Sequence, residues 1–417
     1  MNRPRILLLG GGGPAGHVAD WARRSAAQAD RRGIDLIVAD LRENLPGIAD
    51  LPSVTAAVEC DYRDVAACRR LAAALHAERP LAAVAGFREF SLLSAASAAA
   101  DLGLPWNSVE AIRTARTKDL CRYAVAAAGL PQPECHRVRT PQEAARVLAG
   151  RAGRWIVKPR DAFGSEGVQL FEPGDDVDKL VRRALAFSEE ALVEEFVSGA
   201  EFSAEGILLA GEPHVLELTA KRTTEPPYFV ELGHQQPAPL PKDVADEAVR
   251  TVSRAVRAVG LTHSLFHVEF WVTENRRIIC GEVHARTGGD WIHALTEHRR
   301  PGLDLFGSVF DDILGRPVTL PPADPDRRAA VHVAVPPAGR LTAVTGADRA
   351  AGHRDCLAID VVARPGQITG TLADSFGRGA LVVAGTRRGE DPVARAADLA
   401  GHLRWHTEPV PAPEGTR

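Results

Sequence analysis

The stretch that decides the fold is Leu265-Phe-His-Val-Glu-Phe-Trp-Val-Thr-Glu-Asn-Arg-Arg-Ile-Ile-Cys-Gly-Glu-Val-His-Ala-Arg286. Two runs in which apolar and polar residues alternate flank Glu274-Asn-Arg-Arg277, and this arrangement is typical of a β-hairpin. We place Asn275 and Arg276 at the turn, so that the two runs become neighbouring antiparallel strands.

This hairpin is expected to gather ionisable side chains on one face. With the turn at this position, Glu269 lies opposite Glu282, and His267 lies opposite His284. All four side chains share one face, because successive side chains of a strand alternate between its two faces. The other face is apolar and is expected to pack into the core. Its residues are Phe266, Val268, Phe270, Ile279, Gly281 and Val283.

The two facing carboxylates predict a site for a divalent metal ion. Acids that face each other across a sheet repel unless a cation bridges them, and Mg²⁺ or Mn²⁺ prefers such oxygen ligands. On the hairpin alone, a solvated face with the acids paired to Arg277 and Arg286 explains the pattern equally well. The continuation Arg286-Thr-Gly-Gly-Asp290 favours the metal site, because a guanidinium and two glycines can bind an anion beside it.

The composition is that of an ordinary soluble globular protein with a small-molecule partner. The 417 residues suffice for two or three domains, and a net charge of −4 in mixed sign leaves no basic surface for nucleic acid or membrane. No run approaches the roughly 20 apolar residues of a membrane span. The six cysteines form no Cys-x-x-Cys pair, so neither a disulfide framework nor a zinc site is indicated. We expect a cytoplasmic protein.

Lysine is rare in this chain. Of the 50 basic residues only five are lysines, so those that remain are enriched at places where a compact ammonium matters. They are Lys118, Lys158, Lys179, Lys221 and Lys242.

The order of predicted elements divides the chain into three parts. Residues 1–113 alternate short apolar strands with helices, which predicts a Rossmann-like domain with a parallel sheet. From Trp155 onward strands follow in close succession with glycine turns, so residues 114–322 are expected to form an antiparallel α+β domain. A proline-rich stretch then introduces residues 323–417, which are expected to form a small C-terminal α+β domain.

The glycine-rich start, Gly11-Gly-Gly-Pro-Ala-Gly16, leaves another class of function open. It fits the dinucleotide-binding pattern after a strand, and Asp40 stands where a ribose-binding acid would. An NAD-dependent oxidoreductase is therefore an alternative. However, a tight strand-to-helix turn needs small residues even without a ligand, and Pro14 removes an amide that could face a phosphate.

A lysine at a strand end is followed by a glycine-rich loop. Trp155-Ile-Val-Lys-Pro159 precedes Gly164-Ser-Glu-Gly167, and the Gly-Lys-Ser/Thr triplet of a Walker loop occurs nowhere in the sequence. Such a loop can cover phosphates with its backbone N–H groups while Lys158 supplies charge. Taken alone, a mobile surface hairpin is the better interpretation.

Four features follow one another in a fixed order along the chain. They are Thr117-Lys-Asp-Leu-Cys-Arg122, Lys158 with its glycine loop, Glu194-Glu-Phe-Val-Ser-Gly-Ala-Glu201, and Glu269 with Glu282. This order resembles the ATP-grasp superfamily, including its D-alanine:D-alanine ligase and biotin carboxylase branches. The resemblance covers residues 110–320 closely, and both flanking parts are similar to the family's flanking domains. It implies an ATP-grasp fold of α/β and α+β parts, with a lid at about 130–197.

The resemblance implies ATP as a cofactor and assigns roles residue by residue. Nucleotide contacts are implied for Lys118, Lys158, Gly164, Ser165, Gly167, Glu194, Glu195, Val197 and Glu201. Glu269 and Glu282 would hold Mg²⁺ or Mn²⁺, with two ions expected. His284 stands where the family usually has an asparagine ligand, so its part in metal binding is left open.

Two segments narrow the resemblance to one branch. Pro227-Tyr-Phe-Val-Glu-Leu-Gly-His234 and Glu282-Val-His-Ala-Arg-Thr-Gly-Gly-Asp290 are similar to the bacilysin-type L-amino acid ligases. Substrate contacts are then implied for Glu231, His234, Arg286, Gly288, Gly289 and Trp291. Catalytic roles are implied for Lys158, Glu231, His234 and Arg286.

The implied activity is ATP-dependent joining of a carboxylate to an amine through an acyl phosphate, with release of ADP and phosphate. At least one substrate is expected to be an amino acid. The nearest alternative is a carboxylase or purine-pathway ligase, which keeps the fold and changes the acceptor. A nucleotide-binding module without turnover is a third alternative, because His284 departs from the family pattern. Relatives are often homodimers, so a dimer is a further expectation.

Overall fold

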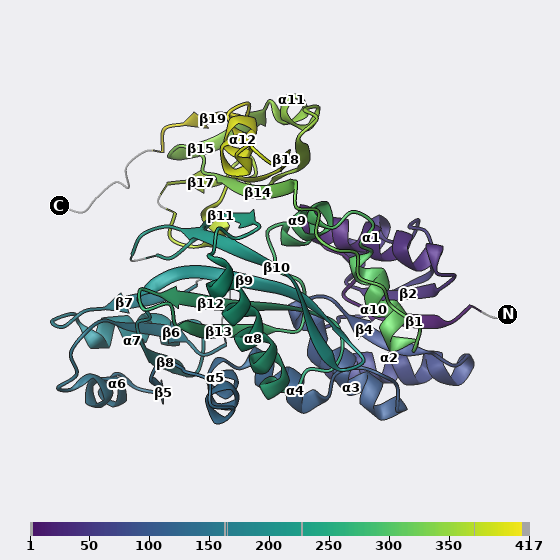
Figure 1. Ribbon diagram of the computed structural model, residues 1–417, viewed down its shortest axis with the longest axis horizontal. Coiled ribbons are helices and arrows are strands. Elements are labelled where there is room, and N and C mark those ends of the chain that lie inside the picture. Colours follow the sequence, from purple (N-terminus) through teal and green to yellow (C-terminus); the bar gives the residue numbers. More distant parts are fainter. Residues whose placement is uncertain (1–2, 162–163, 165, 227, 371, 411–417) are drawn as a thin grey trace.

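Figure 1 shows the computed structural model, which describes residues 3–161, 164, 166–226, 228–370 and 372–410. Two positions named above, Ser165 and Pro227, lie outside these residues. Among the described residues, no helix combines the length and the apolar composition needed to cross a bilayer. The described strands form four sheets.

The N-terminal part is a parallel sheet in the order β3-β2-β1-β4, as predicted for a Rossmann-like domain. All five residues of its inner strand β1 are buried, as a strand covered on both faces requires. The sequence did not indicate β3. The elements are β1 (Arg5–Leu9), α1 (Gly16–Arg31), β2 (Asp35–Asp40), η1 (Arg42–Gly47), β3 (Val54–Glu59), α2 (Val65–Glu78), β4 (Ala83–Gly86), η2 (Glu89–Ser91), α3 (Leu92–Leu102), α4 (Val109–Arg116) and α5 (Lys118–Ala127).

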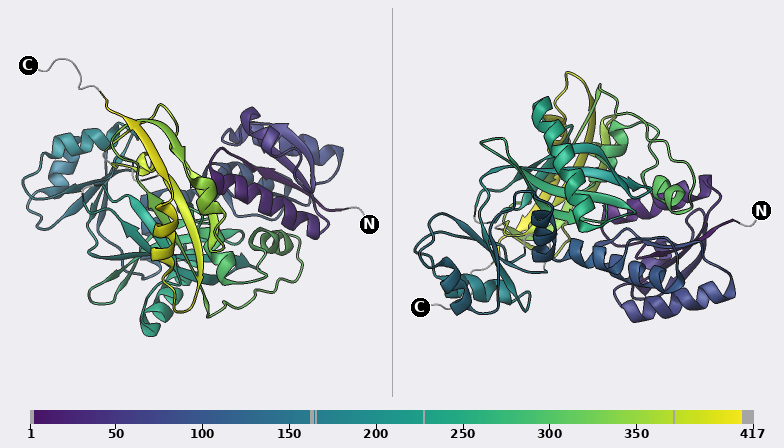
Figure 2. Two further views of the ribbon diagram at one scale, coloured as in Figure 1. Left: turned by 90° about the horizontal axis from the view of Figure 1, so that it is seen from above. Right: turned by 60° about the horizontal axis from the view of Figure 1, so that its bottom comes forward.

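A small antiparallel sheet in the order β5-β8-β6-β7 projects from the rest of the molecule, and we call residues 135–195 the lid (Figures 1 and 2). Its apolar side chains form a core of their own, which includes Val138, Trp155 and Val181. The elements are β5 (Cys135–Val138), α6 (Pro141–Leu148), β6 (Trp155–Pro159), β7 (Gln169–Phe171), α7 (Val177–Leu185) and β8 (Ala191–Glu195).

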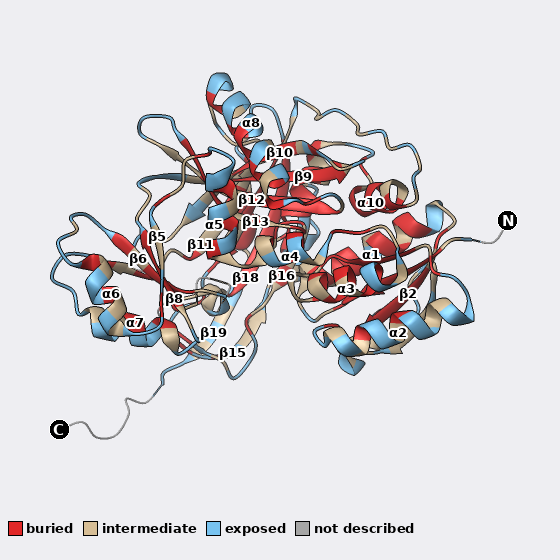
Figure 3. Cartoon of the chain, turned by 90° about the horizontal axis from the view of Figure 1, so that it is seen from below, coloured by how far each residue is buried: buried red, intermediate tan, exposed pale blue. Residues whose placement is uncertain are grey.

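The central sheet has eight strands in the order β13-β12-β9-β10-β11-β14-β18-β16. It shares a hydrophobic core with the N-terminal part, where the ring of Phe87 lies 5.0 Å from that of Phe306. Figure 3 shows buried residues concentrated in these strands and in the helices packed against them. The elements are β9 (Gly199–Leu209), β10 (Glu212–Thr223), β11 (Glu231–Gln236), α8 (Lys242–Val259), β12 (Leu265–Thr273), β13 (Ile278–His284), α9 (Ile292–Arg299) and α10 (Leu305–Ile313).

The C-terminal part is α+β, as predicted, and it also completes the central sheet. Strand β14 pairs with β11, where His332 faces Gly233, and β18 and β16 follow. The other three strands form the sheet β17-β15-β19. The elements are β14 (Arg327–Ala334), β15 (Gly339–Thr345), α11 (Ala347–Ala351), β16 (Cys356–Val361), β17 (Ile368–Thr369), η3 (Ser375–Gly377), β18 (Ala380–Arg387), α12 (Pro392–Ala400) and β19 (Arg404–Glu408).

The hairpin of β12 and β13 has the predicted partners at its open end but a shifted register near its turn. His267 faces His284, as expected. The turn has three residues, because Thr273 and Arg277 close it at 3.0 Å and Arg276 adopts a φ of 57°. A bulge on β13, where Gly281 and Glu282 together lie opposite Glu269, then restores the predicted register.

The bulge changes which side chains face the core. Trp271, which lines the cleft described below, faces Ile279, whereas Phe270 faces Cys280. A Cβ on Gly281 would lie 2.8 Å from the Trp271 ring. The prediction that Ile279 and Gly281 belong to the core face is therefore wrong near the turn.

Candidate active site

A cleft of about 1120 Å³ is lined by residues of the N-terminal part, the lid, the central sheet and the C-terminal part. It brings together most of the side chains predicted to bind nucleotide, metal or substrate. They are Lys118, Lys158, Gly164, Glu194, Glu195, Val197, Glu201, Glu231, His234, Glu269, Glu282, His284, Arg286 and Gly289. Three other predicted residues do not line it: Gly167, Gly288 and Trp291.

Lys158 is held at the end of β6 by a buried carboxylate. Its Nζ lies 2.8 Å from Oε2 of Glu194 on β8, and Arg122 of α5 donates to both oxygens of Glu194 at 2.6 and 2.9 Å. Burial alone would raise the pKa of Glu194, but the two cations hold it well below its usual range. The Glu194 carboxylate therefore orients Lys158 and fastens the lid to α5.

The residues after Glu194 form the lid's edge of the cleft. The N–H groups of Glu195 and Phe196 donate to the carbonyls of Glu134 and Arg154 at 2.8 and 3.0 Å. The Arg154 guanidinium lies 4.2 Å from the centre of the Phe196 ring. Further apolar lining comes from Ile156, Val168 and Trp271. This side of the cleft suits a flat, apolar ring.

Of the described residues of the glycine loop, Gly164 and Glu166 line the cleft. Gly164 lines it with a φ of 68°, a conformation that favours glycine. Gly167 has a φ of 72°, and a Cβ there would lie 2.8 Å from Pro159 and 2.9 Å from Phe187. Gly167 is therefore required by the turn and its packing, which does not support its predicted contact with a nucleotide.

Lys221 of β10 lies at the centre of an acidic cluster that the sequence interpretation missed. Its Nζ lies 2.5 Å from Glu201, 2.8 Å from Glu269 and 3.6 Å from Glu231. Burial opposes a charge there, yet the three carboxylates raise the pKa of Lys221 well above its usual value. The acids predicted to bind ribose, metal and substrate therefore share one ammonium. The scarcity of lysine is the signal that could have identified it.

Glu269 and Glu282 come from neighbouring strands and both line the cleft. Burial would raise the pKa of Glu282, but Lys118, 3.9 Å away, and His284 lower it to about 2. No group of three or more His, Cys, Asp or Glu residues in the described chain is arranged to hold a metal ion. Two carboxylates nevertheless fit Mg²⁺, which typically takes one or two of them and completes its shell with water and phosphates.

Glu89, the first residue of η2, fixes two predicted site residues and was itself missed. Its Oε2 accepts from Arg286 Nε at 2.9 Å and lies 3.3 Å from His284 Nδ1, and its Oε1 accepts from Arg116 at 3.0 Å. The second ring nitrogen of His284 lies 3.5 Å from Glu282. Because both nitrogens have carboxylate partners, His284 is placed to orient Glu282 rather than to bind a metal directly.

A second histidine supports Glu269 from behind. His267 Nδ1 lies 2.9 Å from Glu205 Oε2, and its Nε2 lies 3.6 Å from Glu269 Oε1. Burial would lower the pKa of His267, but Glu205 and Glu269 raise it to about 9. The ring is therefore a cation between two carboxylates at neutral pH, and this favours the ionised form of Glu269.

The predicted amino-acid pocket is polar and contacts the C-terminal part. Ser375 Oγ donates to Glu231 Oε2 at 3.4 Å, and His234 Nε2 lies 3.2 Å from Asp290 Oδ2. Asp290 in turn pairs with Arg378. The sequence interpretation identified Glu231 and His234 but gave no role to their three partners.

Two predicted substrate residues lie behind the cleft wall. Trp291 is 5% exposed, packs against an apolar cluster that includes Leu295, and donates from Nε1 to Asp360 at 3.2 Å. The prediction of Trp291 as a pocket wall is therefore wrong, because its indole is buried in the core instead of lining the cleft. The residue has a φ of 65° at the start of α9. Gly288 packs on His267, since a Cβ there would lie 2.9 Å from Nδ1.

The glycine-rich start serves the packing of the N-terminal part. Gly12 N, Leu41 N and Asn44 Nδ2 all donate to the fully buried Asp40 carboxylate at 2.7 Å. A Cβ on Gly11 would lie 2.5 Å from the Val38 side chain. Asp40 is thus occupied within its own domain, and the NAD-binding alternative loses its ribose ligand.

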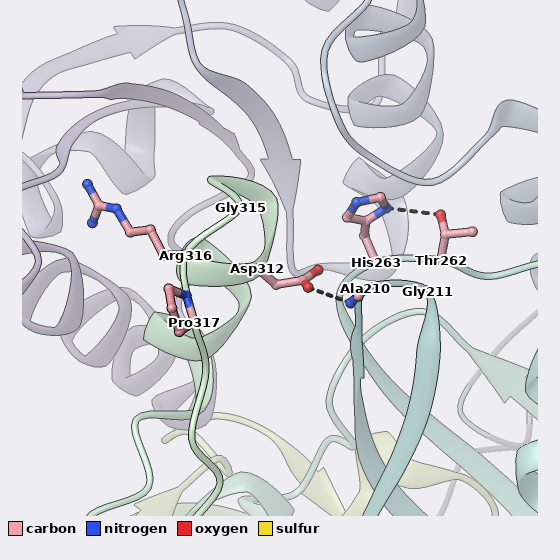
Figure 4. A pocket seen from close by; sticks show the side chains of 8 residues that line it. All are labelled: Ala210, Gly211, Thr262, His263, Asp312, Gly315, Arg316 and Pro317. Atoms are coloured by element: carbon pink, nitrogen blue, oxygen red, sulfur yellow. Dashed lines mark hydrogen bonds between the residues drawn. The ribbon is translucent and has the colours of Figure 1, made fainter.

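Figure 4 shows a second pocket, of about 580 Å³, between the β9–β10 turn and the end of α10. Asp312 accepts from Ala210 N at 2.6 Å, and Thr262 Oγ1 lies 2.9 Å from His263 Nδ1. None of the residues predicted from the sequence lines this pocket, so we assign the candidate site to the larger cleft.

Family models match three successive parts of the chain. Residues 26–106 match an ATP-grasp N-terminal domain, residues 153–295 an ATP-grasp domain, and residues 332–408 the L-amino acid ligase C-terminal domain 2. The matched ranges lie inside the three ranges expected above, whose limits stay predictions.

Curated relatives match over part of their length. An uncharacterised protein of Sinorhizobium fredii is 28% identical over 318 residues, which are 74% of this chain and 65% of that protein. Alanine–anticapsin ligase of Bacillus subtilis is 26% identical over 258 residues, 56% of this chain and 54% of the ligase. The chain thus spans less than two thirds of either relative.

Among solved structures, L-amino acid ligase from Bacillus licheniformis superimposes with a TM-score of 0.82 at 20% sequence identity, over 98% of this chain and 100% of that one. The similarity extends through all parts of the molecule and confirms the predicted ATP-grasp fold with its N-terminal and C-terminal parts.

Proposed function

We propose that this chain, which belongs to the ATP-grasp superfamily and carries the C-terminal domain of L-amino acid ligases, joins a carboxylate to an amine at the expense of ATP. At least one substrate is an amino acid, and the product is an amide. The observation that carries the proposal is that two lysines (Lys118 and Lys158), two carboxylates (Glu269 and Glu282) and the Glu231–His234–Arg286 group line one cleft.

The nucleotide is proposed to lie between the lid and the central sheet. Its adenine occupies the apolar side near Phe196, and its ribose hydroxyls bind Glu201. Lys118 and Lys158 contact the phosphates, and Gly164 belongs to the loop that covers them. An ammonium in a water-poor cleft stabilises phosphate charge more strongly than it would in water.

Glu269 and Glu282 would hold Mg²⁺, which we propose as two ions bound with the triphosphate. When bound, the metal supplies positive charge that neutralises the phosphate oxygens during transfer. The protein's own contribution is orientation: Lys221 and His267 fix Glu269, and His284 fixes Glu282.

The reaction proposed for this cleft has two steps. A carboxylate oxygen attacks the γ-phosphorus, the bond to ADP breaks, and an acyl phosphate forms. The neutral amine nitrogen then attacks the carbonyl carbon, phosphate leaves with its electron pair, and the nitrogen loses a proton. Arg286, steadied by Glu89, holds the substrate carboxylate, and Glu231 or His234 binds the ammonium or takes its proton.

The experiment is amino-acid-stimulated release of ADP from ATP and Mg²⁺, measured for pairs of amino acids, with mass spectrometry of the product. We expect ADP release and a condensed product that lacks one water. Glu282→Gln is expected to abolish both, because it removes one of two metal-binding carboxylates. Glu274→Gln changes an exposed acid at the turn of the same hairpin and is expected to leave both unchanged.

Each alternative predicts a different result. ADP release stimulated by bicarbonate rather than by amino acids would favour a carboxylase. ATP binding without turnover would favour a nucleotide-binding module. Fluorescence of bound NADH would revive the oxidoreductase. Any of these three results, without an amide product, would contradict the proposal.

A further inference from the structure

The C-terminal part closes one end of the cleft with an ion pair. Arg378 Nη1 lies 2.5 Å from Asp290 Oδ2, and Nη2 donates to Oδ1 at 2.9 Å. Arg378 follows η3, whereas Asp290 belongs to the loop after β13, so the pair joins two segments that are far apart in sequence. Both side chains line the cleft and are only 13% and 14% exposed.

This pair is joined to the proposed amino-acid pocket. Asp290 contacts His234 at 3.2 Å, and Ser375, from the same segment as Arg378, donates to Glu231 at 3.4 Å. Residues 375–378 therefore contact both members of the Glu231–His234 pair, one directly and the other through Asp290. The identity of Arg378 is in a position to affect which substrate side chain fits.

Arg378 keeps hydrogen-bonding capacity at the cleft. A guanidinium carries five N–H donors. Within the described residues, three of them are engaged: one from Nε to Ser375 O at 3.0 Å, and two to Asp290. A buried donor without an acceptor is costly, so a ligand that offers an acceptor at this point is favoured over one that does not.

His17 adds a second polar group to the same end of the cleft. It lies on the first turn of α1, lines the cleft, and interacts electrostatically with Asp290 and Arg378. Its Nδ1 is buried and has no hydrogen-bond partner among the residues that the structure describes. Burial lowers the pKa of His17 to about 4, so the ring is neutral and presents one N–H and one lone pair.

The surrounding charges disfavour an anionic side chain. Asp290, Glu231 and Asp360 all act on the one Arg378 guanidinium, so a substrate carboxylate would add a further negative charge. A cationic side chain would meet the remaining donors of Arg378. An aliphatic side chain would offer no partner to the two remaining N–H groups of Arg378 or to Nδ1 of His17. A neutral side chain that both donates and accepts satisfies these groups.

We propose that Arg378, Asp290 and His17 form the side-chain end of the amino-acid pocket and select an amino acid with a neutral hydroxyl or carboxamide side chain. This inference rests on the proposed ligase function. Sites built to hydrogen-bond a substrate group reject analogues that lack it far more strongly than apolar pockets discriminate by size.

The test compares kcat/KM for ADP release between side chains of similar shape, with alanine as the second substrate. Threonine is compared with valine, and asparagine with leucine and aspartate. We expect the hydroxyl and carboxamide substrates to be preferred by at least about tenfold. In Arg378→Met the preference is expected to fall toward unity, mainly through KM.

A second variant guards against a folding defect. Arg378→Met leaves Asp290 without its cation, whereas the double variant Asp290→Asn/Arg378→Met removes both charges and keeps an acceptor for His234. Circular dichroism and the thermal unfolding midpoint verify the fold of each. Arg349→Met changes an exposed arginine on α11 in the same part of the chain and is expected to retain the wild-type preference.

The outcomes separate the inference from the function on which it rests. Equal use of threonine and valine, and of asparagine and leucine, by the wild type would overturn the inference while leaving the ligase intact. A preference that survives in both folded variants would also overturn it. Absence of ADP release with every amino acid would overturn the proposed function, and with it this inference.

Discussion

At the scale of single residues, Lys221 connects three parts of the proposed reaction. It lies within 3.6 Å of Glu201, Glu269 and Glu231, and 3% of its side chain is exposed. In Lys221→Met three half-buried carboxylates lose their common buried counter-charge, and removing one partner of a buried ion pair costs about 3–5 kcal/mol. We expect ADP release to fall at least about a hundredfold, and the thermal unfolding midpoint to fall with it.

The matched control is Lys242→Met. Lys242 belongs to the same scarce set, but its side chain is 87% exposed and pairs with Asp246 one helical turn away. Exposed pairs of this kind contribute little, so activity and unfolding midpoint are expected to stay at wild-type values. Full ADP release by Lys221→Met would show that the ammonium has no part in the reaction.

Glu89→Gln tests whether the N-terminal part positions the substrate-binding arginine. The change keeps the shape of the side chain but removes the charge that holds Arg286 at 2.9 Å and His284 at 3.3 Å. Loss of such supporting partners typically costs 10–100-fold. We expect the KM of the carboxylate substrate to rise by about that factor with a smaller change in kcat. Glu110→Gln, an exposed acid on α4, is the control, and an unchanged KM in Glu89→Gln would contradict the role.

The residues of the site were predictable to the extent that their neighbours in sequence gave them a context. Lys158 ends an apolar strand before a glycine loop, and Glu282 precedes the arginine motif, so both were identified. Glu89 was not, because its partner His284 lies 195 positions away. Arg378 escaped notice for the same reason, since only the fold brings it to Asp290.

At the scale of elements, the β12–β13 hairpin shows what alternation can predict. The pattern correctly paired His267 with His284, but the three-residue turn and its compensating bulge were not indicated. Arg276 adopts a positive φ that Gly or Asn would have signalled, and arginine does not. The pairing partners near the turn were therefore displaced by one residue.

Gly206→Ala tests the packing between β9 and β12. A Cβ on Gly206 would lie 2.0 Å from the Phe266 ring, which is buried at 1% exposure and cannot move without disturbing the core. Overpacking of this kind costs about 1–3 kcal/mol. We expect a lower midpoint in urea unfolding, whereas Gly47→Ala, with nothing within 4 Å of its Cβ, is the control. If the two variants had equal midpoints of urea unfolding, β9 and β12 would accommodate the added methyl group without loss of packing, and the prediction would be wrong.

The attachment of the lid to α5 predicts a pH dependence of stability. Arg122 and Lys158 hold the pKa of Glu194 below its usual value. The interaction of Glu194 with these two cations therefore contributes fully to the free energy of unfolding above about pH 4.3, where unfolded glutamate is ionised. Below that pH the unfolded chain takes up a proton first, and the contribution declines. We expect the difference in free energy of unfolding between wild type and Glu194→Gln to shrink on acidification. A difference that grows instead would contradict the assigned charge state, and Glu110→Gln is again the control.

At the scale of the whole molecule, the sequence indicated three parts but not how they are joined. Glu231-Leu-Gly-His234 was singled out only for its implied substrate contacts, yet it begins β11, to which β14 of the C-terminal part pairs. Pairing between strands so distant in sequence leaves no local pattern. For this reason the continuous central sheet could not be predicted. The homodimer expected from the resemblance is a separate matter and stays a prediction.

The arrangement of cores distinguishes the lid from the C-terminal part. The lid has its own apolar cluster, and its two ends lie side by side, since Glu195 N donates to Glu134 O at 2.8 Å. Replacing residues 135–194 by a short Gly-Ser linker, with Arg122→Met to remove the guanidinium that Glu194 leaves behind, is expected to give a folded protein that no longer binds ATP.

Deleting residues 327–410 removes three strands from the central sheet and exposes the edge of β11, so insoluble protein is expected. Calorimetry with ATP and the fraction of protein in the soluble extract measure the two results, and an insoluble lid deletion beside a soluble C-terminal deletion would reverse this view of the molecule.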